Sequence, residues 1–270
     1  MEKKYLGTES RIFYKKNKFD PKRSTLVFVH GLAGSSSAWI PYENKFKKYY
    51  NLLSFDLRGN GKSFRPKKFE DYSMEKSAND LYLLLRHEKI FKCILISHSF
   101  GNLVVLEFLR KHQNMVTSAI FVSPHYAPSK RELSRMIVPL FLLAPLLNLS
   151  RKEEGGHVDY SSYKNVGDWD LKLNFVDAKN TGLKSYINLT EHSYYFDAED
   201  LLKKIKIPVL IIHGRKDTIF PVSHAEKMSK QIKNSKMIIL NGANHLIPLN
   251  DIEKLSKLIK GFVENQPKGT

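Results

Sequence analysis

Short apolar runs of strand length alternate with segments of helical period along most of the chain. Such an alternation is typical of a parallel sheet covered by helices on both faces. The strand-length runs lie at residues 25–30, 50–55, 93–97, 119–123, 209–213 and 237–240. The segments of helical period lie at residues 74–87, 102–112, 223–231 and 251–263. The pattern predicts an α/β fold with a mostly parallel central sheet, and residues 5–15 would add an antiparallel hairpin at one edge.

The alternation stops between residues 124 and 206. This stretch contains an apolar run at 136–149, interrupted by two prolines, and an aromatic stretch at 186–196. A structureless connection of this length would be unusual inside a compact domain. We therefore predict that residues 1–123 and 207–270 form the core and that residues 124–206 form an inserted helical cap.

The formal net charge of the 270 residues is +17. Such a charge favours acidic partners. However, the lysines are spread over the whole chain, without zinc-finger spacing or an aromatic RNA-binding signature. We interpret the charge as a solvated, lysine-rich surface and predict no nucleic-acid partner, while peripheral contact with acidic lipids stays open.

Two further features bear on location. The run 136–149 is shorter than the roughly 20 residues that a bilayer span needs, so we predict no stable membrane insertion. The N-terminal residues are charged and lack a following apolar core, which argues against a signal peptide and favours a cytoplasmic location.

Cys93 is the only cysteine, and its apolar neighbours indicate a buried core residue without a disulfide.

Candidate chemistry begins with the pentapeptide Ser97-His98-Ser99-Phe100-Gly101, which follows an apolar strand and opens a helix. A tight turn there would lift Ser99 above the sheet, with backbone donors of the helix N-terminus beside it. Small residues two positions before and after the nucleophile suit such a turn. Glycine is usual at the first of these positions, so Ser97 is a small departure. By itself the motif is a weak signal, because serine and glycine are common in ordinary turns.

Three more motifs follow other predicted strands. His30-Gly31-Leu32 would place the Leu32 amide beside that of Phe100, so that both hold an oxyanion. Asp217 and His245 follow the last two strands, and the carboxyl ends of parallel strands share one edge of the sheet. A serine hydroxyl needs a base, and an imidazole needs an acid to orient it. We therefore predict Ser99 as nucleophile, His245 as base and Asp217 as acid.

At these motifs the chain resembles capped members of the α/β-hydrolase superfamily, from about residue 26 to residue 263. The order serine, aspartate, histidine is the order of that superfamily. The segment 56–63, Asp-Leu-Arg-Gly-Asn-Gly-Lys-Ser, resembles a loop that is structural in these enzymes. The resemblance implies acyl transfer through a serine, and it argues against the epoxide hydrolases and haloalkane dehalogenases, which use an aspartate at the elbow.

Other histidines compete for a role in the site. We expect His98, which would project away from the exposed edge of Ser99, and His30, beside the oxyanion turn, to be structural. His125, His157 and His192 lie in the predicted cap or at its boundary, and nothing in their spacing requires contact with a substrate. No cluster has the spacing of metal ligands, so we predict neither a metal nor a cofactor.

The cap bears on the substrate. Met136, Phe141 and Leu142 are candidates for lining an apolar acyl pocket, although the same run would equally serve to pack the cap onto the core. The sequence favours a carboxylic ester hydrolase acting on a small molecule with a small to medium acyl group. The alternatives are an aminopeptidase, in which Glu153, Glu154 or Glu191 would bind an ammonium, a C–C bond hydrolase, a thioesterase, or a binding protein without turnover.

Overall fold

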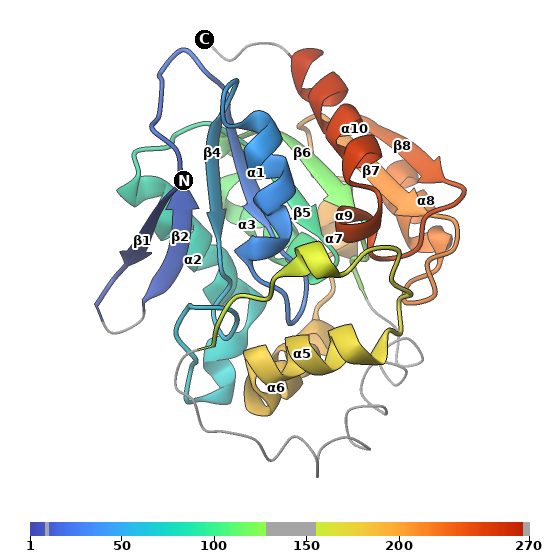
Figure 1. Ribbon diagram of the computed structural model, residues 1–270. Coiled ribbons are helices and arrows are strands. Elements are labelled where there is room, and N and C mark those ends of the chain that lie inside the picture. The colour runs from blue at the N-terminus through green and yellow to red at the C-terminus, as the bar shows by residue number, and fades with distance from the viewer. Residues whose placement is uncertain (9–10, 128–154, 267–270) are drawn as a thin grey trace.

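The computed structural model describes residues 1–8, 11–127 and 155–266. Within them, eight strands form one sheet in the order β1-β2-β4-β3-β5-β6-β7-β8 (Figure 1). The strands are β1 (Glu2–Leu6), β2 (Ile12–Lys16), β3 (Thr25–Val29), β4 (Asn51–Phe55), β5 (Cys93–His98), β6 (Val116–Val122), β7 (Val209–Gly214) and β8 (Ser235–Leu240). From β4 to β8 all neighbouring strands pair in parallel, whereas β1 and β2 form the antiparallel edge. The predicted fold class and edge hairpin are confirmed.

Helices cover both faces of the sheet, as the uninterrupted apolar strands require. On β3, Val27 and Val29 point into one apolar cluster, whereas Leu26 and Phe28 point into the other. The first cluster is closed by α2 (Met74–His87), α3 (Phe100–His112) and α8 (Val222–Gln231). The second is closed by α1 (Ile40–Phe46), the single-turn α9 (Ile247–Asn250) and α10 (Ile252–Glu264).

Most predicted boundaries lie within two residues of the observed ones. The largest shifts are at β1, which begins at Glu2 rather than at 5, and at β6, which begins at Val116 rather than at 119 because Val116 already pairs with Cys93 on β5. The third helix begins at Phe100, directly after Ser99, so that the tight turn is one residue long.

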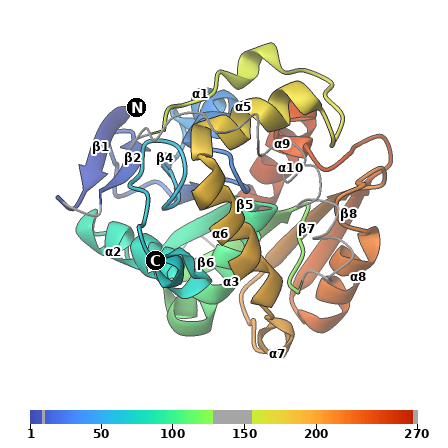
Figure 2. The ribbon, with the colours of Figure 1, turned by 90° about the horizontal axis from the view of Figure 1, so that it is seen from below.

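The chain between β6 and β7 contains the turn η4 (Tyr160–Ser162) and the helices α5 (Leu171–Thr181), α6 (Leu183–Tyr195) and α7 (Glu199–Leu202). Figures 1 and 2 show α5 and α6 lying across one end of the sheet. The predicted pocket residues Met136, Phe141 and Leu142 lie outside the described residues. Among the described helices, none is both long and apolar enough to cross a bilayer.

Candidate active site

The chain turns sharply between β5 and α3, and Ser99 forms this turn. Its backbone has φ +49° and ψ −120°, a conformation that non-glycine residues rarely adopt. A side-chain carbon at Gly101 would lie 2.5 Å from the carbonyl oxygen of His30, so only glycine fits there. Ser97 fits where glycine is usual because its buried hydroxyl turns inward and donates to Asn102 Oδ1 at 2.6 Å. The packing around Ser99 thus fixes the strained turn.

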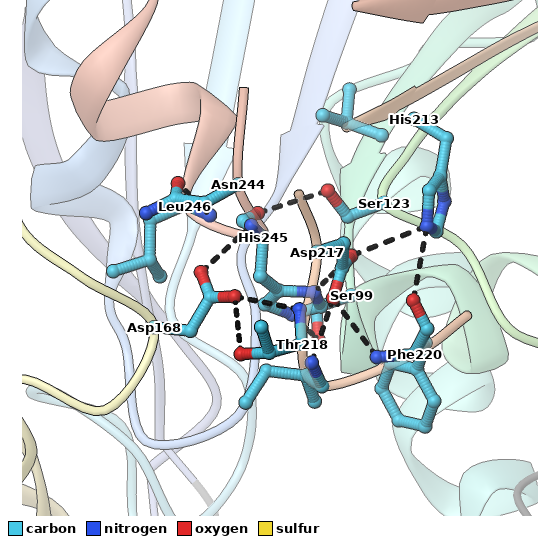
Figure 3. Close-up of polar contacts among 12 residues, drawn as sticks. Ser99, Ser123, Asp168, His213, Asp217, Thr218, Phe220, Asn244, His245 and Leu246 are labelled. Atoms are coloured by element: carbon cyan, nitrogen blue, oxygen red, sulfur yellow. Dashed lines mark hydrogen bonds and ion pairs between the residues drawn. The ribbon is translucent and has the colours of Figure 1, made fainter. Parts of the chain in front are cut away.

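Ser99, His245 and Asp217 form a continuous chain of hydrogen bonds (Figure 3). The distance from Ser99 Oγ to His245 Nε2 is 2.9 Å, and that from His245 Nδ1 to Asp217 Oδ2 is 2.8 Å. The second oxygen of Asp217 accepts hydrogen bonds from the amides of Ile219 and Phe220, each at 2.9 Å. The structure therefore brings together the three residues that the sequence motifs singled out, in the order that a nucleophile, a base and an orienting acid require.

The surroundings of Asp217 and His245 lower the pKa of the carboxyl group and raise that of the imidazole. Burial favours the neutral form of Asp217, but the imidazole of His245 and the amides around the carboxylate hold its pKa below the usual range. Burial likewise opposes protonation of His245. The carboxylate of Asp217, and more weakly that of Asp168, nevertheless raise the pKa of His245 above its ordinary value. An imidazole that accepts a proton readily beside an ionised acid is suited to act as a base.

The loop that carries His245 is fixed from both sides. Asp168 Oδ1 accepts the backbone N–H of His245 at 2.8 Å, and its other oxygen accepts the N–H and the hydroxyl of Thr218, both at 2.8 Å. On the other side, Ser123 Oγ and His98 Nε2 donate to the carbonyl oxygen of His245 at 2.9 and 3.0 Å. Asp168, from the segment between η4 and α5, thus links the loop of Asp217 to that of His245 (Figure 3).

Leu32 and Phe100, the predicted oxyanion donors, lie on loops that converge at Ser99. A side-chain carbon at Gly31 would lie 3.4 Å from the Cβ of Ser99, so glycine allows the Leu32 loop to approach the nucleophile. Phe100 is the first residue of α3, where a backbone N–H has no partner within the helix. Neither N–H is donated to an acceptor elsewhere in residues 1–8, 11–127 and 155–266. Both donors are therefore available to a ligand.

A cavity of about 740 Å³ opens above Ser99 and His245. Its walls come from the Leu32 loop, α5 and the start of α9, and most of the side chains are apolar. The apolar lining residues are Leu32, Ala33, Ala38, Trp39, Trp169, Leu171, Leu173, Phe175, Ala178, Ile219, Leu246, Pro248 and Leu249. A pocket of this size and character is suited to a small organic substrate.

The polar side chains of Tyr160 and Asp177 line this pocket, and neither was predicted as a site residue from the sequence. Tyr160 Oη donates to Asp177 Oδ1 at 2.8 Å, and both residues line the cavity. A sequence signal was available, because Asp177 lies four residues after Leu173 and four before Thr181, both of which are buried. A carboxylate among the buried residues of a helix is unusual, and its presence predicts a polar partner for it in the fold.

The competing histidines make other contacts. His98 differs from expectation, because it lines the cavity and its ring lies 5.1 Å from that of His245. Burial and the neighbouring His245 lower the pKa of His98 to about 3, so it stays neutral. His30 donates to the carbonyl oxygen of Gly31 at 2.7 Å, and His157 contacts Asp56 Oδ2 at 2.7 Å. His192 contacts the carbonyl oxygen of Phe69, and His125 stacks on Phe220.

The loop 56–63 is held by hydrogen bonds and an ion pair, most of them with residues outside the loop. Asp56 accepts the amides of Ser36 and Lys62 at 2.7 and 2.8 Å, and it also contacts His157. The guanidinium of Arg58 forms a two-pronged ion pair with buried Asp80 at 2.6 and 2.7 Å. These contacts fix the loop beside the cavity and leave neither charged group directed at Ser99.

The sequence is similar to a protein family and to several known proteins. A family model described as the alpha/beta hydrolase fold matches residues 24–251. Epoxide hydrolase 3 of Xenopus tropicalis is 32% identical over 107 residues, which make up 39% of this chain and 29% of that protein. The chain spans less than a third of the length of the curated relatives that match it at 32% identity.

Two solved structures match this chain over 99% of its length, in contrast to the shorter matches with the curated relatives. MGS-M2, an alpha/beta hydrolase enzyme from a Medee basin deep-sea metagenome library, matches with a TM-score of 0.80 at 18% identity, over 99% of both chains. The esterase RhEst1 from Rhodococcus sp. ECU1013 matches with a TM-score of 0.77 at 21% identity, over 99% of this chain and 100% of that chain. At these identities the likeness shows the fold alone.

Proposed function

The chain belongs to the α/β-hydrolase fold family, and on this premise we propose that it is a serine hydrolase that cleaves carboxylic esters through an acyl-enzyme on Ser99. The observation that carries the proposal is the hydrogen-bonded chain from Ser99 through His245 to Asp217. A serine on the strained turn also distinguishes this site from the aspartate chemistry expected of epoxide hydrolases.

The proposed reaction has two steps. His245 Nε2 takes the proton of Ser99 Oγ while that oxygen attacks the ester carbonyl, and Asp217 stabilises the imidazolium. The amides of Leu32 and Phe100 bind the negative oxygen of the tetrahedral intermediate. Collapse expels the alcohol, which receives the proton from His245. Water, deprotonated by His245, then attacks the acyl-enzyme, and a second collapse releases the acid and restores Ser99.

The pocket supports a small to medium ester as substrate. Its apolar walls suit the hydrocarbon part of such a molecule, and RhEst1, which shares the fold, is an esterase. We further propose that residues 124–206 act as a cap, since α5 supplies one wall of the cavity. The partner implied is a small molecule. A cytoplasmic location and the absence of nucleic-acid partners remain part of the proposal, as does peripheral contact with acidic lipids.

The test is hydrolysis of p-nitrophenyl esters from acetate to palmitate by the wild type, Ser99→Ala and Ser223→Ala. Ser223 is an exposed serine on α8 and serves as the matched control. We expect Ser99→Ala to lower kcat by at least about a thousandfold and Ser223→Ala to retain the wild-type rate. The optimum chain length measures the pocket.

Labelling with a fluorophosphonate separates the alternatives. If Ser99 is labelled but no ester is hydrolysed, the substrate would instead contain a peptide, thioester or C–C bond that the same triad cleaves. Folded wild-type protein that neither takes up the label nor hydrolyses any ester would contradict the proposal and favour a binding protein.

A further inference from the structure

Tyr160 and Asp177 form a polar pair in an otherwise largely apolar wall. Their hydrogen bond is 2.8 Å long, and both side chains are half-buried, so that they open onto the cavity that also contains Ser99. The proposed mechanism uses neither of them. The N-terminus of α5 does not need the carboxylate of Asp177 either, because Asp170 already caps that helix through the amide of Leu173.

Within the part of the chain that the structure describes, the carboxyl group of Asp177 has no basic partner. Across residues 1–8, 11–127 and 155–266, its polar side-chain contact is with Tyr160, and no lysine, arginine or histidine pairs with it. The other neighbouring groups are the neutral phenol of Tyr186 and, beyond Tyr160, the carboxylate of Asp56, which is already bound to His157. Burial raises the pKa of Asp177 to about 7, an effect that the Tyr160 hydrogen bond only partly offsets.

The pair lies beside the loop that carries the oxyanion donor. Tyr160 Oη is 3.8 Å from the position that a side-chain carbon at Gly34 would occupy, and Gly34 follows Leu32 by two residues. A ligand that reaches Ser99 therefore shares its cavity with Asp177.

A shielded carboxylate without a cation is costly, and a bound ammonium would relieve that cost. An ammonium offers three donors and a charge, so it binds a carboxylate more strongly than a neutral hydroxyl does. We propose that Asp177 is a specificity-determining residue that binds a primary amine on the substrate, so that the enzyme prefers esters whose acyl or alcohol chain carries an ammonium. This assignment of a substrate class rests on the proposed hydrolase function.

Binding can be tested without turnover. Trp39 and Trp169, the two tryptophans of the chain, both line the cavity, so their fluorescence reports a ligand there. We would titrate n-hexylamine and hexan-1-ol at about pH 8, where the amine is charged and Asp177 is ionised. The proteins are the wild type, Asp177→Asn and Glu264→Gln, each also with Ser99→Ala. Glu264 is an exposed carboxylate at the end of α10, outside the cavity, and is the matched control.

We expect the wild type to bind hexylamine at least about tenfold more tightly than hexanol, as a charged hydrogen bond in a shielded site implies. Asp177→Asn should reduce the ratio to about one, whereas Glu264→Gln should keep it. Equal binding of amine and alcohol by the wild type, or an unchanged ratio in Asp177→Asn, would overturn the proposal.

A second variant covers the case in which Asp177→Asn does not fold. Tyr160→Phe removes the internal donor and leaves the carboxylate, so the preference for hexylamine should rise. A ratio that does not move in this variant would contradict the role of Asp177. Because the titrations need no catalysis, an absence of ester hydrolysis would count against the proposed function and leave this result standing.

Discussion

At the scale of single residues, the site depends on carboxylates in distinct surroundings. Asp217 is ionised and orients His245, and Asp168 accepts the backbone N–H of that histidine. Asp177, in contrast, is shielded and titrates near neutrality. Their neighbours, more than their residue type, decide these differences.

The charge of Asp168 gives a pH-dependent prediction. Its carboxylate contributes to the raised pKa of His245, which must be neutral to act as the proposed base. Asp168→Asn removes this contribution, so the acid limb of the profile of kcat/KM against pH should move to lower pH. Asp170→Asn, two residues away at the helix cap, is the control. A limb that stays in place would show that Asp168 acts only through its hydrogen bonds.

At the scale of elements, the segment before α5 is bound to the loop of His245. Asn244 Nδ2 and Asn250 Nδ2 donate to the carbonyl oxygen of Val166 at 2.7 and 2.9 Å, and the amide of Val166 donates to Asn250 Oδ1 at 3.1 Å. The position of Asp168 therefore depends on side chains that follow β8.

Replacing Asn250 should loosen this attachment. Asn250→Ala removes both of its hydrogen bonds to Val166, and we expect a loss of about 1–3 kcal/mol in the free energy of unfolding, with a higher KM for esters. Urea unfolding and steady-state kinetics measure the two effects. Asn265→Ala, at the exposed end of α10, should change neither. Wild-type kinetics in Asn250→Ala would mean that the segment is held by other contacts.

The positions of Ser99, Asp217 and His245 follow from the sequence, whereas those of the polar pocket residues between β6 and β7 do not. Buried parallel strands are apolar throughout, so β3, β5 and β7 stand out, and Ser99, Asp217 and His245 lie directly beyond strand ends. Asp168 has no such signal of position, because its partners Thr218 and His245 lie in distant segments of the chain. The spacing of buried residues around Asp177 marks an unusual carboxylate but does not identify Tyr160 as its partner. The direction of His98 was also missed, since a sharp turn reorients the side chain next to Ser99.

At the scale of the whole molecule, the protonation of Asp177 makes the free energy of unfolding depend on pH. In the folded protein this carboxyl keeps its proton up to about pH 7, whereas the unfolded chain releases it near pH 4. Between these values the folded state binds more protons, so a rise in pH lowers the stability of the wild type.

Asp177→Asn lacks this titration. The free energy of unfolding of the variant, relative to the wild type, should therefore increase between about pH 5 and about pH 8. Urea unfolding at both pH values measures the difference, with Glu264→Gln as control. A constant difference would show that Asp177 is ionised in the folded protein at both pH values.

The pairing of β6 with β7 joins Ala119 to Val209 across the whole segment 120–208. The entropy of closing such a connection grows only with the logarithm of its length, so doubling it would cost about 0.6 kcal/mol. For loop closure alone, insertions in the segment that bears Asp177 therefore cost little, provided that the contacts of Val166 and Asp168 are kept, and the sheet keeps its register. The residues that contact a bound molecule can thus change while Ser99, Asp217 and His245 stay in place.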